Sequence, residues 1–472
     1  CSSDLLIMKA QTPGREDDGM SFYEKVNQQG QRLLEIATRA VAEARRAGAD
    51  EVLADVGGGR RLAVSARDGE VEDLDFSDGY TMYLNVYRGH RTGTTSTTDL
   101  SADAVSDCVR SALSIAAYAD ADPCAGLCDE DRICRDFPDL KLLYAPQEDT
   151  DAAVRQVVEL ERAAGASVGG GIKKSDGASY SSEYQLSALA TSHGVAAVSA
   201  GSLCECSLSF IGQRTPESKM QSDYGFAVSR DYTRLESSEK VLEEARRRTL
   251  DRLDARPVPS GRYDVIFKDH AARSLWGNLS SAINGPAIYQ RSSFLCDRLG
   301  EQIMPAFMSI HEDPWIKGGW LSRNFDGKGE RCEPMDIIAG GILRAYLLSV
   351  YSARRLKMKS NGHGSGISNW QVSADAAHTL SFEKLCARSD TCLVITDLMG
   401  QGVDLVSGNY SRGASGYLVR HGERVHAVEE ITVAGNLRDM FAGIAYIGDD
   451  VDKRHGILSG SLLIPDLAVS GI

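Results

Sequence analysis

Apolar residues recur at helical spacing in the stretch that follows Ser21, and the pattern ends near Gly48, a residue type that often terminates helices. The positions that share this spacing are Phe22, Val26, Leu33, Ile36, Ala37, Ala40, Val41 and Ala44. The pattern predicts an amphipathic helix at the start of the first folded domain, which we place over residues 20–120.

Short segments of strand character follow this helix. "EVLADV", "LAVSA" and "YTMYLNVYRG" are separated by "GGGRR" and "RDGE", which predicts turns at both glycine-containing separators. Segments this short, with such punctuation, favour an antiparallel set over βαβ units. Ser101 then begins a second helix, and the aperiodic residues 121–147 are interpreted as a connection.

A second domain is predicted over residues 148–254, where a helix beginning near Thr150 is followed by strand-like sequence and a charged helix. Residues 255–261, "ARPVPSG", place two prolines and a glycine between elements and form the clearest linker. Cys204 and Cys206 alternate on a predicted strand and are expected to share one face.

Residues 262–472 combine the strands "YDVIF" and "TCLVITDLMG" with the hairpin "YLVRHGERVHAV" and a short helix capped by Asn436. This composition of elements predicts a β-rich domain. The whole chain is therefore predicted to be an α+β protein, with two N-terminal domains that mix helices and antiparallel strands, followed by a β-rich C-terminal domain.

Composition narrows the class of protein. The chain has 472 residues, of which 42% are hydrophobic and 25% are charged, and its net charge of −14 argues against a non-specific nucleic-acid binder. No apolar stretch approaches the ~18 residues of a membrane span. The 11 cysteines are scattered and odd in number, which is typical of a reducing compartment and indicates the cytoplasm.

The first residues stand apart from the folded domains. Residues 1–19 are polar and without period, which indicates a disordered leader. Cys1 followed by serines leaves open a lipidated terminus instead.

The junction between "YDVIF" and the next helix carries an acid and an imidazole. Asp269 stands where a helix N-cap is expected, and His270 follows it. A zinc peptidase helix needs two imidazoles about one turn apart. Ser274 and Leu275, one turn beyond His270, supply neither, so capping and interaction with the helix dipole are favoured over a metal site.

The remaining motifs favour structural roles. His311–Pro314, "HEDP", lacks a following histidine and contains a proline, which indicates a turn. Cys124, Cys128 and Cys134 are spaced too irregularly for a zinc knot and are interpreted as loop or buried thiols. The glycine-rich stretch after Met399 lacks the phosphate-binding spacing, and no Gly-x-Ser-x-Gly motif is present.

Four long segments of the last domain resemble one known family. "GPAIYQRSSFLCDRLGEQI", "YLLSVYSARRLKMKSNGHGSGISNW", "ITDLMGQGVDLVSGNYSRGASGYLV" and "VEEITVAGNLRDMF" look like the C-terminal domain of the TldD/PmbA family, and specifically its PmbA branch, also called TldE. The resemblance extends over nearly everything from Met20 onward.

This resemblance implies a cytoplasmic peptidase system in which a TldD-type subunit carries zinc on a His-Glu-x-x-x-His helix, with a later cysteine as another ligand. Such systems degrade unfolded or flexible peptides and mature peptide antibiotics. The matching helix here begins Asp269-His270, with Ser274 and Leu275 one turn later, so the two-histidine set is broken in either register. No cysteine follows Cys392.

We therefore expect a chain without catalytic residues and without a bound cofactor. It would pair with a TldD-type zinc subunit and shape the groove for an extended peptide, and a homodimer is possible when that partner is absent. Asn361, His363 and Asn369 are the candidate peptide contacts, and turn formation is an equal alternative for all three.

Two other functions stay open. A free-standing metallopeptidase could use a rearranged site, and its candidate ligands are His270, His363, His421 or His426, and Glu429 or Glu430. A regulatory interaction protein, such as a modulator of a toxin–antitoxin or topoisomerase system, would need no peptidase role.

Overall fold

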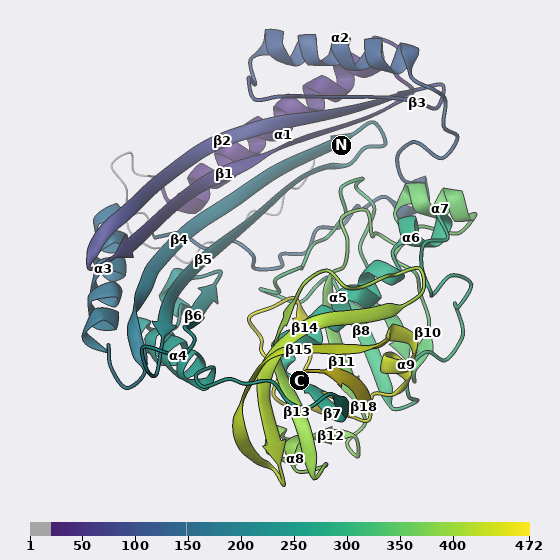
Figure 1. Cartoon of the computed structure of the whole chain (residues 1–472). Coiled ribbons are helices and arrows are strands. Elements are labelled where there is room, and N and C mark those ends of the chain that lie inside the picture. Colours follow the sequence, from purple (N-terminus) through teal and green to yellow (C-terminus); the bar gives the residue numbers. More distant parts are fainter. Residues whose placement is uncertain (1–19, 148) are drawn as a thin grey trace.

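The computed structural model describes residues 20–147 and 149–472 (Figure 1). The predicted leader, residues 1–19, lies outside the described residues. The chain forms a long curved sheet with helices on its convex face, which arches over a β-rich C-terminal domain. None of the helices in the described ranges has the length and apolar character that a membrane crossing requires.

The first helix, α1 (Phe22–Arg46), forms where the apolar spacing predicts it. Ser21 and Glu24 make a reciprocal capping box at its start, and its buried face includes Leu33 and Ala40. The other N-terminal helices are α2 (Ala102–Tyr118), α3 (Thr150–Ala166) and α4 (Ser238–Asp251). All four pack their apolar stripes against one face of the sheet.

Strands from both N-terminal segments form one antiparallel sheet in the order β3-β2-β1-β4-β5-β6. The strands are β1 (Glu51–Arg67), β2 (Glu70–Arg88), β3 (Arg91–Thr97), β4 (Ile172–Thr191), β5 (Ala196–Gly212) and β6 (Gln221–Ser229). β1 pairs with β4 along most of its length, so the two segments share a continuous sheet. The boundaries between N-terminal domains stay a prediction.

β1 corrects one sequence expectation. It runs without interruption through Gly57–Gly59, so the turn predicted at "GGGRR" is wrong. A Cβ atom on Gly58 would lie 2.0 Å from the carbonyl oxygen of Gly79, and one on Gly59 would lie 1.9 Å from that of Tyr184. These glycines allow close approach of the neighbouring strands. The hairpin at Asp68-Gly69 is confirmed.

Five strands of the C-terminal domain close into a small barrel, because β7 pairs with both β13 and β18. These strands are β7 (Gly261–Phe267), β13 (Thr391–Met399), β14 (Asn409–Arg420), β15 (Glu423–Asn436) and β18 (Leu462–Ser470). The hairpin predicted between β14 and β15 is confirmed. Asn436 caps α9 (Leu437–Ala442), as predicted.

A second sheet of the C-terminal domain has the order β10-β9-β8-β11-β17. Its strands are β8 (Met308–Asp313), β9 (Met335–Ala339), β10 (Ile342–Leu343), β11 (Asn369–Ala374) and β17 (Ile457–Leu458). The shorter elements nearby are β12 (Thr379–Leu380), β16 (Tyr446–Gly448), α6 (Gly285–Tyr289), α7 (Val350–Leu356) and α8 (Phe382–Cys386). The predicted α+β class, with an antiparallel N-terminal sheet and a β-rich C-terminal domain, is confirmed.

β8 contains the "HEDP" residues His311 and Glu312, so the turn predicted there is wrong. The strand pairs with β11 from Met308 to Asp313, and a turn begins only at Pro314, after its last residue. Met308, Ile310 and Glu312 alternate onto a buried face. The two-residue alternation of buried side chains therefore indicates a strand in this segment, and the proline ends it.

Helix α5 (Asp269–Ala282) belongs to the main C-terminal core. Its side chains Leu275, Trp276 and Leu279 are fully buried in one cluster with residues from the barrel and from the second sheet. Trp276 stacks on Phe441 with ring centroids 6.0 Å apart. The packing holds the first turn of α5 in a fixed position beside the barrel.

The described cysteines form no disulfide. Cys204 and Cys206 are buried on the same face of β5, as predicted, and burial raises the pKa of each thiol to about 12. Cys128 and Cys134 are also buried thiols. Thiols with pKa values raised in this way are poor nucleophiles at neutral pH, which assigns them to packing.

Candidate functional site

Helix α5 begins directly after β7 and places Asp269 and His270 in its first turn. The N-cap residue is Lys268, so the prediction that Asp269 caps the helix is wrong. The carboxylate of Asp269 lies 3.3 Å from Nη1 of Arg273 and 3.8 Å from Nζ of Lys268. A carboxylate in the first helical turn interacts favourably with the helix dipole. The role of Asp269 here is electrostatic.

Arg273 lies against the imidazole of His270. Its Nη2 atom is 3.0 Å from Nδ1 of His270. A guanidinium can only donate hydrogen bonds, so Nδ1 is the acceptor and its lone pair points at Arg273. That nitrogen is thereby engaged by a fixed positive charge.

The positions one turn further along α5 are also occupied. Arg412, from β14, donates from Nη1 to Oγ of Ser274 at 2.7 Å and from Nη2 to the carbonyl oxygen of Leu398 at 3.1 Å. Leu275 is fully buried in the core. The start of α5 therefore presents one carboxylate, one imidazole, one hydroxyl and two guanidiniums.

His270 lines a cavity of about 300 Å³ at the junction between the N-terminal sheet and the barrel. The other lining residues are Asp176, Ser209, Ser222, Asp223, Tyr224, Arg248, Arg252, Thr396 and Asp397. They come from β4, β5, β6, β13 and the end of α4. Only the tertiary fold brings these elements together.

The charged groups of this cavity are paired with one another. Asp223 lies 3.0 Å from Nε of Arg248 and 3.2 Å from Nη1 of Arg252, which also lies 3.4 Å from Asp397. Asp176 lies 2.9 Å from Nη1 of Arg67. Each carboxylate of the cavity thus already has a guanidinium partner, and Arg252 links the sheet side of the cavity to the barrel side.

The pKa of His270 is lowered from its ordinary value. The largest cause is displacement of water from around the imidazole, followed by the positive charges of Arg273 and Arg248. The negative charges of Asp397 and Asp269 raise the pKa of His270, but their effect is smaller than the combined lowering. The ring is therefore held in its neutral form over a wider pH range than a histidine in water.

We expect the Arg273→Ala variant to raise the pKa of His270, because the adjacent cation is removed while Asp269 and Asp397 remain. Titration of the histidine side-chain resonances by NMR, with His270→Gln identifying the signal, measures the shift. Arg234→Ala, which removes an exposed arginine outside this cavity, is the control. An unchanged pKa in Arg273→Ala contradicts the electrostatic role given to Arg273.

The three predicted peptide contacts all lie in internal hydrogen bonds. Asn361 accepts from the amide of Leu348 at 2.8 Å and donates to the carbonyl oxygen of Tyr346 at 2.8 Å. Asn369 accepts from the amide of Leu321 at 2.9 Å and is 2% exposed. These bonds hold loops of the second sheet, and a role in peptide binding stays a prediction.

His363 belongs to a buried polar cluster that sequence reasoning missed. Its Nε2 atom lies 2.9 Å from Oε1 of Glu312, and its Nδ1 atom lies 2.8 Å from Oδ1 of Asn361. Ser368 and Trp370 donate further hydrogen bonds to the Glu312 carboxylate. The alternation of apolar residues before Glu312 was the available signal that this acid faces inward.

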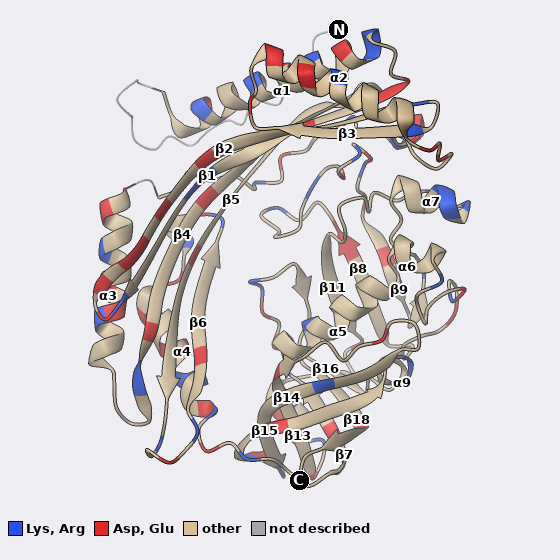
Figure 2. Cartoon of the chain, turned by 45° about the horizontal axis from the view of Figure 1, so that its top comes forward, with Lys and Arg blue, Asp and Glu red and all other residues tan. Residues whose placement is uncertain are grey.

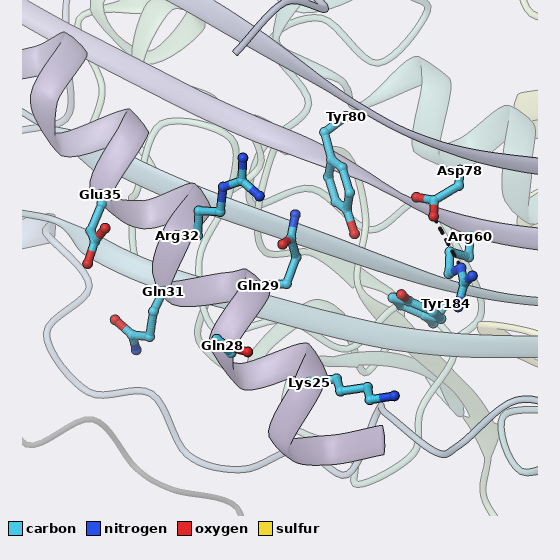
Figure 3. A pocket seen from close by; sticks show the side chains of 10 residues that line it. All are labelled: Lys25, Gln28, Gln29, Gln31, Arg32, Glu35, Arg60, Asp78, Tyr80 and Tyr184. Atoms are coloured by element: carbon cyan, nitrogen blue, oxygen red, sulfur yellow. Dashed lines mark ion pairs between the residues drawn. The ribbon is translucent and has the colours of Figure 1, made fainter. Parts of the chain in front are cut away.

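A larger cavity of about 700 Å³ lies between α1 and the sheet (Figure 3). Its lining residues are Lys25, Gln28, Gln29, Gln31, Arg32, Glu35, Arg60, Asp78, Tyr80 and Tyr184. Arg60 and Asp78, which face each other on the paired strands β1 and β2, form an ion pair at 3.2 Å on its sheet wall. The lining is polar throughout, and it is separate from the cavity at His270.

Comparisons with known proteins match the chain to one family along most of its length. Residues 260–471 match the PmbA/TldA metallopeptidase C-terminal domain, residues 144–253 match the central domain, and residues 56–116 match domain 1. Metalloprotease PmbA of Escherichia coli O157:H7 is 39% identical over 87% of this chain and 90% of its own length. This chain belongs to the PmbA/TldD family, on its PmbA branch.

Two solved structures show the same family fold. TldE from Thermococcus kodakarensis covers 92% of this chain and 100% of its own, with a TM-score of 0.77 and 16% identity. A Bacteroides thetaiotaomicron protein described as a candidate modulator of DNA gyrase covers 93% of this chain and 98% of its own, with a TM-score of 0.84 and 22% identity. At these identities the likeness is one of fold.

The metallopeptidase family raises the question of whether the donor set at α5 fits a zinc ion. A zinc site needs three or four nitrogen, sulfur or carboxylate ligands with free lone pairs. Nδ1 of His270 faces Arg273, and Ser274 and Leu275 supply no suitable donor. The residues of this family member at α5 do not fit a zinc ion.

The rearranged site considered from the sequence is not assembled by the described fold. His421 lies on the β14–β15 turn, His426 faces the carbonyl oxygen of Ala427 at 2.8 Å, and His363 is buried beside Glu312. Glu429 and Glu430 both contact Lys219. Within residues 20–147 and 149–472, no three His, Cys, Asp or Glu side chains are grouped to hold a metal ion.

Proposed function

We propose that this chain is the zinc-free subunit of a two-subunit PmbA/TldD peptidase that cleaves unfolded or flexible peptides. The observation that carries the proposal is the placement of Arg273 and Arg412 on His270 and Ser274, the helix positions where a metal ligand set would stand. The two guanidiniums repel a dication from this turn, and Arg273 engages one of the two ring nitrogens of His270. The catalytic zinc is therefore assigned to a TldD-type partner.

The role of this chain in the complex is to shape the peptide groove and stabilise the catalytic partner. Unfolded peptides are commonly held extended through backbone hydrogen bonds to an edge strand, a mode that needs few particular side chains. The long sheet of this chain offers strand edges of that kind. The family resemblance and the unpaired thiols support a cytoplasmic location.

Complex formation is the first test. We expect coexpression with the TldD-type chain of the same organism to give a stable heterodimer in size-exclusion chromatography with light scattering at micromolar concentration. The heterodimer should hold about one zinc ion by elemental analysis, because one subunit supplies the whole ligand set. The isolated chain should hold no stoichiometric zinc after dialysis, and it should be monomeric or homodimeric.

Activity provides the control for this assignment. The heterodimer should hydrolyse an unfolded peptide, and the activity should disappear when a zinc ligand of the partner is replaced, while Arg273→Ala in this chain leaves hydrolysis in place. Stoichiometric zinc on the isolated chain, or hydrolysis by it alone, contradicts the proposal. Recovery of a different partner and no TldD-type chain in a pull-down supports a regulatory role instead.

A further inference from the structure

The outer edge of β2 is open over more than half of its length. β1 pairs with β2 from Glu70 to Tyr87, whereas β3 pairs only with Met82–Arg88. The outward backbone groups of residues 70–81 make no hydrogen bond to any described residue. Residues 70–79 are all exposed. Proteins normally cover or shorten such an edge, because it is a template for another strand.

Apolar side chains on this segment are exposed beside a buried core. Val71, Leu74 and Phe76 are 43%, 50% and 58% exposed. In the β1–β2 register, Leu74 and Phe76 lie opposite Val64 and Leu62, which are buried under α3. They therefore continue the helix-covered apolar face beyond the end of its cover. Exposed apolar side chains on an open edge indicate an interaction surface rather than a protected margin.

The same segment carries only negative charge. Its acids are Glu70, Glu72, Asp73, Asp75 and Asp78, with no Lys or Arg among residues 70–79. Figure 2 shows the acidic colour running along this part of β2. Arg60 and Arg67 on β1 pair with Asp78 and Glu72, while Glu70, Asp73 and Asp75 form no ion pair with a described residue.

We propose that the β2 edge, residues 70–81, receives a strand of the TldD-type partner that carries Lys or Arg side chains and apolar residues at alternate positions. This assignment rests on the proposed function. Backbone hydrogen bonds would extend the sheet, cations would meet Asp73 and Asp75, and apolar side chains would cover Leu74 and Phe76.

The charges select this occupant over two others. A second copy of this chain would place its own carboxylates opposite these, which destabilises a cross-strand pair. A peptide substrate of varied sequence would give no reason for an edge that carries only acidic side chains over residues 70–79. A basic strand of the partner would both form backbone hydrogen bonds with the open edge and pair with its acidic side chains.

Hydrogen–deuterium exchange of the heterodimer tests the edge directly. We expect the amides of residues 70–81 to exchange more slowly in the complex than in the isolated chain, because new strand pairing protects them. We also expect Asp73→Lys/Asp75→Lys to weaken complex formation about tenfold or more, with the loss diminishing at high salt.

The matched control is Glu159→Lys/Glu243→Lys, which makes the same change in net charge at exposed positions on α3 and α4. This variant should bind the partner like the unsubstituted chain, and circular dichroism checks that both variants are folded. A complex that forms without protection of residues 70–81, or that tolerates Asp73→Lys/Asp75→Lys, overturns this assignment alone. Failure of the unsubstituted chain to form any complex overturns the proposed function and this assignment with it.

Discussion

The Glu312→Ala variant is expected to lose about 3–5 kcal/mol of unfolding free energy, because it removes a buried carboxylate from its hydrogen-bonding partners. Glu312 is 2% exposed and accepts hydrogen bonds from His363, Ser368 and Trp370. Nε2 of His363 lies 2.9 Å from Oε1 of Glu312, and its Nδ1 atom lies 2.8 Å from Oδ1 of Asn361, so the imidazole is held between the two side chains. Removal of the carboxylate leaves His363, Ser368 and Trp370 without this hydrogen-bond partner in the protein interior.

Urea unfolding followed by tryptophan fluorescence measures this loss. The four tryptophans of the chain, Trp276, Trp315, Trp320 and Trp370, all lie in the C-terminal domain, so the signal reports on the domain that contains Glu312. His311→Ala is the control, because His311 is an exposed neighbour on the same strand whose pair with Asp336 is at the surface. A loss in Glu312→Ala no larger than in His311→Ala would falsify the buried-pair account.

The pH dependence of this contribution has a definite sign. Burial raises the pKa of Glu312, but the hydrogen bonds and charge of His363, with the donors of Trp370 and Ser368, lower it below its ordinary value overall. A carboxyl group with a lowered pKa stabilises the fold at neutral pH and loses that contribution as the pH falls through the lowered pKa. The stability gap between the unsubstituted chain and Glu312→Gln should therefore narrow in acid.

The second large effect is expected for Trp276→Ala, at about 3–5 kcal/mol of unfolding free energy. The indole is fully buried, stacks on Phe441, and donates from Nε1 to Oγ of Ser459 at 2.8 Å. Its removal leaves a large cavity at the centre of the core that joins α5 to the barrel and the second sheet. The position of the first turn of α5, with His270 and Arg273, depends on that packing.

Urea unfolding followed by tryptophan fluorescence also measures the stability of Trp276→Ala, with Trp315→Ala as the matched control. Trp315 is 39% exposed, so its truncation creates no cavity and should change stability by less than about 1 kcal/mol. Trp276→Phe should lie between the two, since it keeps most of the apolar volume and loses the bond to Ser459. Equal stability of Trp276→Ala and Trp315→Ala would show that α5 is not held by this core.

The start of α5 shows how far residue types alone can carry a functional argument. Ser274 and Leu275 in the sequence already break the two-imidazole pattern of a zinc helix, since neither side chain is a nitrogen ligand. The structure adds that Arg273 donates to Nδ1 of His270 and Arg412 donates to Oγ of Ser274, which places two positive charges at this turn. Arg273 was visible at helical spacing from His270, whereas Arg412 comes from a strand 138 residues away from Ser274.

Local pattern determined those features whose physical cause is local. The apolar period predicted α1, the Asp68-Gly69 pair predicted a hairpin, and Asn436 predicted the start of α9, because each depends on neighbours a few residues apart. Long motifs in a constant order also identified the family. The β-rich character of the C-terminal domain followed from the same short-range signals.

Tertiary structure alone decided the continuous strand through Gly57–Gly59, the contact of Glu312 with His363, and the cavity at His270. The glycines suggested a turn, but their lack of a side chain serves the close approach of strands β2 and β4. Glu312 meets His363 across 51 residues, and the cavity draws on five separate strands and helices together with α5. Contacts between distant segments depend on how the sheets pack. The periodicity of a single segment predicts which of its residues are buried, but it does not predict which distant residues they contact.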